Sequence, residues 1–403
     1  MPEAVIVATA RTPIGRANKG SLVECRPDDL SALIVKAVLE KVPALDPGLV
    51  EDVVWGCGQP AGEAGYNVAR VVAILGGIPQ APGVTVNRYC SSSLQTIRMA
   101  THAIKAGEGD VFVAGGVETV SRFLKGMSDG LPDTHNPQFA EAEDRTTKRN
   151  EGGQGDWTPP SGLPDVYIAM GDTAENVAEL TRTTRDEMDE FAALSQNRAV
   201  EAQNNGFFER EITPVPLADG TEVTKDDGPR PDTTKEKLAE LKPVFRPDGT
   251  VTAGNACPLN DGAAAVVVMS ESKASELGIT PLARVVSSGV TALDPEIMGL
   301  GPIEACKQAL GRAGLSIDQI DLVEINEAFA AQVIPSAKEL GIPWDKLNVH
   351  GGAIALGHPF GMTGARIMTT LLNGLEDRDG RYGLETMCVG GGQGMAMVVE
   401  RLT

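Results

Sequence analysis

Hydrophobic positions along the chain fall into two alternating kinds of segment. Short apolar runs, such as AVIVATA at 4–10 and DVFVAGGVE at 110–118, are typical of buried strands. Segments with apolar residues every three or four positions, such as DDLSALIVKAVLEKV at 28–42 and SSLQTIRMATHAIKAG at 92–107, predict helices with one buried face. The alternation predicts an α/β fold in which helices cover buried strands.

The same order of elements occurs twice. The segment from TVNRYC to GGVE at 85–118 contains a strand, a turn of small residues, a helix, a second strand and a Gly pair. The segment from NVHGG to GGGQG at 348–394 repeats that order. The repeat indicates an internal duplication of a half-domain that is roughly a hundred residues long or slightly longer.

A polar, Pro- and Gly-rich region at 121–250 interrupts this pattern. It contains two helical stretches, at 172–181 and 185–206, and is too long for a structureless loop in a compact domain. We therefore expect an inserted lobe with its own helices. The predicted division is a first half at 1–120 plus 251–272, an inserted loop domain at 121–250 and a second half at 273–403.

Charge and composition exclude several classes of protein. The chain has 403 residues and a formal net charge of -20, which argues against a nucleic-acid partner. No stretch approaches the roughly 20 apolar residues of a membrane span, so no membrane partner is expected. The six cysteines show no CxxC pair, which excludes a zinc knuckle or a disulfide framework and favours a reducing, cytoplasmic location.

Cys90 lies directly after a strand-like run and directly before a helix-like one. A helix N-terminus lowers the pKa of a thiol, so this position suits a nucleophile, although a buried inert cysteine is an equally open interpretation. A nucleophile needs a base. Of His102, His135, His350 and His358, the last lies in the Gly-rich loop GGAIALGHPFGMTG and is the leading candidate, with His350 as a weaker rival.

Other polar groups also follow apolar runs. Cys388 precedes consecutive glycines in TMCVGGGQG, which could equally mark a tight turn. Asn326 and Glu327 follow a strand-like run in EINEAFAAQ, where Asn could orient a water or simply cap a helix. Residues at the C-terminal ends of strands line the functional crevice of an open α/β sheet, so we expect these groups to meet.

These stretches resemble the thiolase family. The motifs are NRYCSSSLQ, NEAFA, GGAIALGHPFGMTGAR and CVGGGQG, together with MGDTAENVA and VTAGNACPLNDGAAA, in the family's order over essentially the whole chain. The resemblance implies a five-layer αβαβα thiolase fold of two duplicated halves with an inserted loop domain. It also implies a homodimer or homotetramer, CoA thioesters as substrates, no metal and no tightly bound cofactor.

The resemblance assigns a role to each catalytic candidate. Cys90 would accept the acyl group, and His358 would activate it. Cys388 would be the acid/base that exchanges a proton with the α-carbon of the second acyl-CoA. Asn326 would hold a water that forms one oxyanion site with His358, and the backbone N–H groups of Cys90 and Gly390 would form the other.

The resemblance also implies contacts with substrate and CoA, and two of the positions depart from the family pattern. Ala169 stands where short-chain biosynthetic members often have His, and Cys257 stands where Ser is frequent. The turn NRYCSSS favours degradative 3-ketoacyl-CoA thiolases. The expected substrate and CoA contacts are Met170, Arg230, Lys237, Ala256, Cys257, Met298 and Phe329.

The expected function is that of an acyl-CoA:acetyl-CoA C-acyltransferase in fatty acid metabolism. It would cleave 3-ketoacyl-CoA with CoA, as in β-oxidation, or run the reverse Claisen condensation through an acyl-Cys90 intermediate. One alternative is a ketoacyl-synthase-like condensing enzyme, against which Cys388 speaks. Others are a non-catalytic acyl-CoA-binding protein with the same fold and a Cys–His hydrolase.

Overall fold

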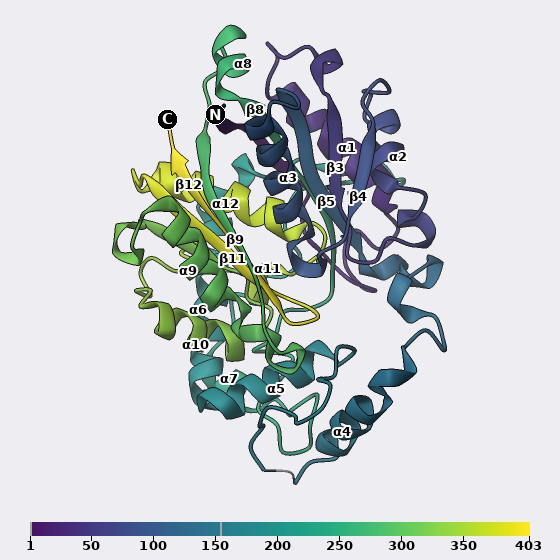
Figure 1. Ribbon diagram of the computed structural model, residues 1–403, viewed down its shortest axis with the longest axis vertical. Helices are drawn as coiled ribbons and strands as arrows, with labels where there is room; N and C mark the ends of the chain where they lie inside the picture. The colour runs from purple at the N-terminus through teal and green to yellow at the C-terminus, as the bar shows by residue number, and fades with distance from the viewer. Residues whose placement is uncertain (1, 154) are drawn as a thin grey trace.

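The computed structural model describes residues 2–153 and 155–403, and Figure 1 shows its layers of helices and strands. The strands are β1 (Ala4–Arg11), β2 (Gly15–Arg16), β3 (Asp52–Gly56), β4 (Gly83–Val86), β5 (Val111–Thr119), β6 (Val215–Pro216), β7 (Glu222–Val223), β8 (Asn260–Ser270), β9 (Ala283–Ala292), β10 (Leu322–Ile325), β11 (Tyr382–Val389) and β12 (Gln393–Arg401). The helices are α1 (Pro27–Glu40), α2 (Val68–Leu75), α3 (Ser92–Ala106), α4 (Ala140–Asn150), α5 (Met170–Thr181), α6 (Arg185–Asn204), α7 (Lys235–Ala239), α8 (Glu271–Glu276), α9 (Gly301–Ala313), α10 (Ala330–Leu340), α11 (Ala353–Leu356) and α12 (Thr363–Asp377).

The two halves of the sheet have matching strand orders. The first half runs β4-β3-β5-β8-β1 and the second runs β10-β11-β12-β9, with parallel pairs at β3–β4, β3–β5 and β10–β11. An isolated parallel bridge between Val323 and Leu347 takes the place of β4 in the second half. The halves join where β1 pairs with β9, at Val5–Arg284 and Ile6–Ala283, so nine strands form one continuous path, and the short β2 pairs with β8 beside it.

Helices cover both faces of each half, which gives the five predicted layers. Helices α1 and α2 lie outside the first half, α9 lies outside the second, and α3 and α12 form the middle layer (Figure 1). All 11 residues of β8 are buried, as the continuous apolar run predicts for a strand covered on both faces. The structure therefore confirms the predicted α/β fold.

Glycine lets the two middle helices approach closely. A Cβ atom on Gly364, at the start of α12, would lie 2.3 Å from the backbone nitrogen of Leu94 in α3. Ser93 Oγ accepts a hydrogen bond of 2.9 Å from the backbone N–H of Ala365 at the same crossing. The N-terminal ends of these equivalent helices, and the loops that precede them, are therefore held together.

Three local expectations differ from the structure. The strand expected to run to Cys90 ends at Val86, because the chain then turns sharply into α3. The strand expected from Leu347 is reduced to its single bridge. The inserted region also contains α4 and α7 beside the two expected helices; α4 buries only Ala142, so its sequence has no apolar period to reveal it. Among the described helices, none is long and apolar enough to cross a membrane.

Candidate active site

Cys90 lies in a tight turn between β4 and α3, and its residue is 8% exposed. The preceding residue, Tyr89, has φ 42°, a left-handed conformation that is uncommon for a bulky side chain. Hydrogen bonds hold the turn: Asn87 Oδ1 accepts from the N–H of Tyr89 at 2.8 Å, and Ser92 Oγ accepts from the N–H of Arg88 at 2.9 Å.

The environment of Cys90 corrects the expectation of a low pKa. Burial raises the pKa of its thiol to about 12, and the negative charge of Glu118 acts in the same direction. The backbone N–H groups of Gly390 and of Cys90 itself point at the sulfur and lower the pKa, but they do not outweigh burial. The resting thiol is therefore protonated, and it needs a base to become a nucleophile.

His358 has the tautomer that a base requires. Its Nδ1 lies 2.6 Å from Thr363 Oγ1, and that hydroxyl donates its own proton to the carbonyl of Pro359 at 2.8 Å. Thr363 Oγ1 must therefore accept a hydrogen bond from Nδ1–H, so the proton of the neutral ring is on Nδ1 and Nε2 is unprotonated. The Nδ2 group of Asn326 donates to Nε2 at 3.2 Å. Burial lowers the pKa of His358 to about 3, so the ring is neutral and can accept a proton.

The other three histidines lie elsewhere. His102 and His135 are exposed, as expected. His350 is stacked on Phe207 with ring centroids 3.6 Å apart, and burial lowers its pKa to about 4. It packs against the interior of α12 near Gly374, so it is not the rival base that its neighbourhood in the sequence suggested.

Cys388 lies at the end of β11, fully buried. Burial raises the pKa of its thiol well above the usual range, and the neighbouring sulfurs of Cys90 and Cys257 add to the shift. A Cβ atom on Gly390 would lie 3.4 Å from the Tyr89 ring and 3.6 Å from the sulfur of Met170. The structure thus brings the cysteines, Gly390 and Met170 to one place.

Several predicted substrate contacts line the same region. Ala256 pairs with Phe329 across an isolated bridge, and the N–H of Cys257 donates to the carbonyl of Ala328 at 2.9 Å. Met298 is 1% exposed and belongs to the same buried cluster as Ala256, Phe329 and Cys388.

The two basic candidates lie at the surface, not within this buried cluster. Arg230 and Lys237 are both exposed on the inserted lobe. Lys237 Nζ donates to the carbonyl of Asp232, and the backbone N–H of Arg230 donates to Gln196 Oε1. No hydrogen bond or ion pair among the described residues joins either side chain to the sulfur cluster.

Sequence reasoning missed two buried groups at the site. Thr363 fixes the tautomer of His358, but in the sequence it is an ordinary residue at the start of a helix and gives no signal of that role. Glu118 ends the apolar run VFVAGGVE and is 2% exposed; a charge at the end of a buried strand was the available signal. Within the described residues, no group of three or more His, Cys, Asp or Glu is placed to hold a metal ion.

Comparisons with known proteins agree with this geometry. The N-terminal domain of thiolases matches residues 4–272, and the C-terminal domain of thiolases matches residues 279–401. A 3-ketoacyl-CoA thiolase from Idiomarina loihiensis is 46% identical over 411 residues, covering 100% of both chains. A 3-oxoadipyl-CoA/3-oxo-5,6-dehydrosuberyl-CoA thiolase from Escherichia coli is 45% identical, with the same coverage.

A solved structure is also similar. The crystal structure of the Bacillus anthracis acetyl-CoA acetyltransferase superposes with a TM-score of 0.85 at 39% sequence identity, covering 100% of this chain and 99% of that chain.

Proposed function

The chain belongs to the thiolase family, and on that premise we propose that it cleaves 3-ketoacyl-CoA with CoA, or condenses two acyl-CoA molecules in reverse. The observations that carry the proposal are two buried cysteines, Cys90 and Cys388, whose sulfurs lie close enough to interact, and a neutral His358 with an unprotonated Nε2. A carbon–carbon bond next to a thioester can be cleaved by such a set, because it supplies a nucleophile, a base and a separate acid.

In the first half-reaction, Cys90 passes its proton to His358 Nε2, and the sulfur attacks the 3-keto carbon. The N–H groups of Cys90 and Gly390, which converge on this sulfur, are placed to receive negative charge that develops beside it. The bond between C2 and C3 then breaks and leaves its electron pair on C2. Cys388 protonates that carbon, which gives acetyl-CoA and an acyl-Cys90 thioester.

In the second half-reaction, CoA enters and Cys388, now a thiolate, removes its thiol proton. The CoA sulfur attacks the acyl carbon, the bond to Cys90 breaks, and the Cys90 sulfur takes back the proton held on His358. Acyl-CoA leaves, and both cysteines and the histidine return to their starting forms. In the first half-reaction, the water that Asn326 would hold beside His358 would stabilise the oxygen of the enolate that forms as the bond between C2 and C3 breaks.

The acyl chain is proposed to be longer than that of acetoacetyl-CoA. The relatives at 45–46% identity are named for 3-ketoacyl and 3-oxoadipyl substrates, whereas the acetyl-CoA acetyltransferase is 39% identical. The turn NRYCSSS points the same way. We assign Arg230 and Lys237 to the CoA nucleotide and Met170, Ala256, Cys257, Met298 and Phe329 to the pantetheine and acyl chain.

The domain division and assembly are further parts of the proposal. A first half at 1–120 plus 251–272 is supported by β8, which returns from the inserted lobe to pair with β1 and β5. A homodimer or homotetramer is supported by the open edge of β4 and by exposed apolar side chains elsewhere on the first half and the inserted lobe, such as Tyr66 at 95% and Leu124 at 100% exposure. Six free cysteines support a cytoplasmic location.

The decisive experiment is thiolysis of 3-ketoacyl-CoAs of rising chain length, followed by mass spectrometry of the intact protein. We expect acetyl-CoA and the shortened acyl-CoA as products and a trapped acyl group on Cys90. Cys90→Ala is expected to abolish both. Turnover with no acyl-enzyme, or release of CoA without a new acyl-CoA, would contradict the proposal and favour a hydrolase.

A further inference from the structure

We propose that Glu118 is a positioning residue that fixes the His358 loop against the loop that follows β3. This inference rests on the proposed thiolase function, because it concerns the placement of the proposed base. Glu118 is the penultimate residue of β5, and its carboxylate points across the C-terminal end of the sheet toward both loops. It touches no substrate atom in this account and acts through the backbone.

The carboxylate accepts hydrogen bonds from two separate loops. Oε2 accepts from the N–H of Gly58 at 2.8 Å and from the N–H of Gly361 at 2.9 Å. Oε1 accepts from the N–H of Gln59 at 3.1 Å, and the thiol of Cys57 lies 3.7 Å from it. Since Gly361 follows His358 by three residues, one side chain ties the loop of the base to the end of β3.

Backbone packing at the same place makes the position of the loop sensitive to these bonds. A Cβ atom on Gly361 would lie 2.2 Å from the carbonyl oxygen of Val117 and 2.8 Å from that of Gly56. A Cβ atom on Gly116 would lie 2.1 Å from the carbonyl oxygen of Gly361. The loop therefore runs in direct contact with the ends of β3 and β5, and the acceptor for the N–H of Gly361 there is Glu118.

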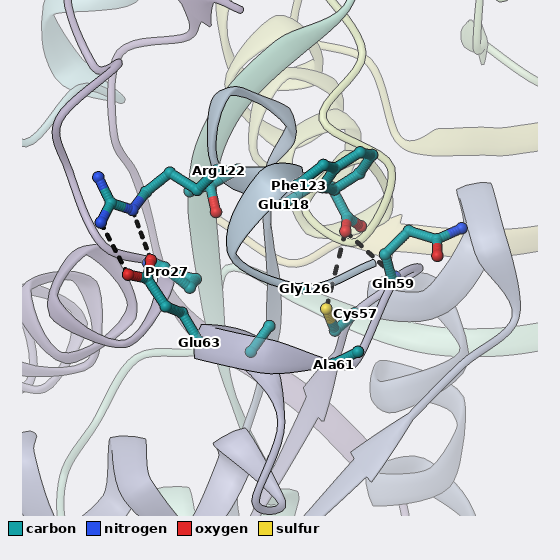
Figure 2. Close-up of a pocket in the computed structure, with 11 residues that line it drawn as sticks. Pro27, Cys57, Gln59, Ala61, Glu63, Glu118, Arg122, Phe123 and Gly126 are labelled. Carbon is teal, nitrogen blue, oxygen red and sulfur yellow. Dashed lines mark hydrogen bonds and ion pairs between the residues drawn. The ribbon is translucent and has the colours of Figure 1, made fainter. Parts of the chain in front are cut away.

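The charge of Glu118 is balanced by backbone groups rather than by a cation. Figure 2 shows Glu118 directed at Cys57 and Gln59, while the guanidinium of Arg122 pairs with Glu63 instead. In the part of the chain that the structure describes, no lysine or arginine lies within ion-pair distance of Glu118. Burial raises the pKa of Glu118 to about 7, and the three backbone N–H groups act in the opposite direction by stabilising the carboxylate. The ionised form, which accepts from all three N–H groups, therefore predominates above neutral pH and anchors both loops there.

Direct electrostatic help to Cys90 does not explain the residue. The charge of Glu118 raises the pKa of the Cys90 thiol, so it opposes formation of the thiolate. A group that disfavours ionisation of the nucleophile must contribute in another way. The contacts with Gly58, Gln59 and Gly361 supply that contribution.

The test compares Glu118→Gln and Glu118→Asp with a control at another buried carboxyl, Glu324→Gln. Gln keeps the shape of Glu118 but puts an amide donor where one carboxylate oxygen accepts, so donors would face donors. Asp keeps the carboxylate and shortens its reach. Burial raises the pKa of Glu324 to about 8, so Gln resembles its protonated form, and the charged neighbours that affect this pKa most are Arg366, Glu327 and Glu211 rather than groups of the two loops.

We expect Glu118→Gln to lower kcat for thiolysis about tenfold or more while KM changes less than about threefold, because one buried hydrogen bond is left unmade. Glu118→Asp should recover part of kcat. Hydrogen–deuterium exchange should quicken in peptides covering 57–61 and 358–362 in Glu118→Gln, and not in Glu324→Gln.

Unchanged kcat together with unchanged exchange in both loops would overturn the proposal. A rise in hydrogen–deuterium exchange of equal size along the whole chain of both Glu118 variants would also overturn the proposal. Glu118 would then stabilise the protein as a whole rather than position the two loops. If the wild-type protein cleaves no 3-ketoacyl-CoA, the proposed function fails. The exchange of the two loops still decides whether Glu118 holds them.

Discussion

Asn326 Nδ2, directly after β10, and His358 Nε2, in the loop between α11 and α12, lie 3.2 Å apart. Thr363 accepts the proton on Nδ1, so Nε2 is unprotonated and its lone pair accepts the hydrogen bond from Asn326. To take a proton, Nε2 must exchange the donor of Asn326 for the incoming one. His358 is therefore held by a donor on one side and an acceptor on the other. Its role as a base depends on both.

Thr363→Val removes the acceptor for His358 Nδ1–H with little change of shape. The buried N–H is left without a partner, which costs about 1–3 kcal/mol. If the same free energy is added to the barrier of the step in which His358 takes the proton of Cys90, kcat for thiolysis falls about ten- to a hundredfold. Steady-state kinetics with a 3-ketoacyl-CoA and CoA measure the change.

Thr369→Val is the matched control. Thr369 lies on the same helix, is equally buried, and donates to the carbonyl of Ala365 at 2.9 Å without touching His358. We expect its kcat to stay within about twofold of wild type. Wild-type kcat in Thr363→Val would show that the tautomer of His358 is set by another contact.

His358 also makes stability depend on pH. Burial lowers its pKa from 6.5 to about 3, so between these values the unfolded chain binds a proton that the folded chain does not. Its contribution is present above pH 6.5 and is lost as pH falls. Between pH 6.5 and about 5 the loss is about 2 kcal/mol, which urea unfolding at several pH values would measure.

His358→Gln should flatten this pH dependence of the free energy of unfolding. His135→Gln, at a side chain that is 49% exposed, should leave it close to wild type. Equal curves for wild type and His358→Gln would mean that the ring is not kept neutral by burial.

Cys388→Ala separates the roles of Cys90 and Cys388 in the reaction. Acetyl transfer from acetyl-CoA to Cys90 needs no proton at carbon, so the acetyl-enzyme should still form and be seen by mass spectrometry. Cleavage of 3-ketoacyl-CoA requires the proton from Cys388 and should fall by about 10²–10⁴-fold. Cys306→Ala removes another fully buried thiol, on α9, and should keep most of the cleavage activity. A Cys388→Ala enzyme that cleaves normally would assign the acid to another group.

The sequence predicted the α/β fold for physical reasons, and the structure brings two of the predicted site residues, Cys90 and Cys388, close together. The buried strands have apolar runs; Cys90 lies in the turn after β4, and Cys388 lies at the end of β11. The repeat of elements predicted that the two halves would face each other. The helices α3 and α12 pack as equivalents for that reason.

Other properties depend on contacts that no local pattern records. The pKa of Cys90 is set by burial under the assembled halves, which outweighs the helix terminus visible in the sequence. Tyr89 adopts a positive φ, which the sequence does not predict for a bulky residue. The hydrogen bonds of Glu118 come from segments separated by up to 243 positions, so only the folded chain reveals them.

Two glycine substitutions test how tightly the His358 loop is packed. Gly361→Ala would place a Cβ atom 2.2 Å from the carbonyl oxygen of Val117, and backbone atoms on both sides must then shift. We expect a loss of about 1–3 kcal/mol in the free energy of unfolding and a lower kcat, because His358 moves with the loop.

Gly311→Ala is the counterpart in an open place. A Cβ atom there meets nothing within 4 Å, and Gly311 lies within helix α9, where alanine is favoured over glycine by about 0.5–1 kcal/mol. This variant should gain stability and keep wild-type kcat. The two free energies of unfolding should therefore move in opposite directions from wild type. If Gly361→Ala were as stable and as active as Gly311→Ala, the close contact of the His358 loop with β5 would have no part in placing the base.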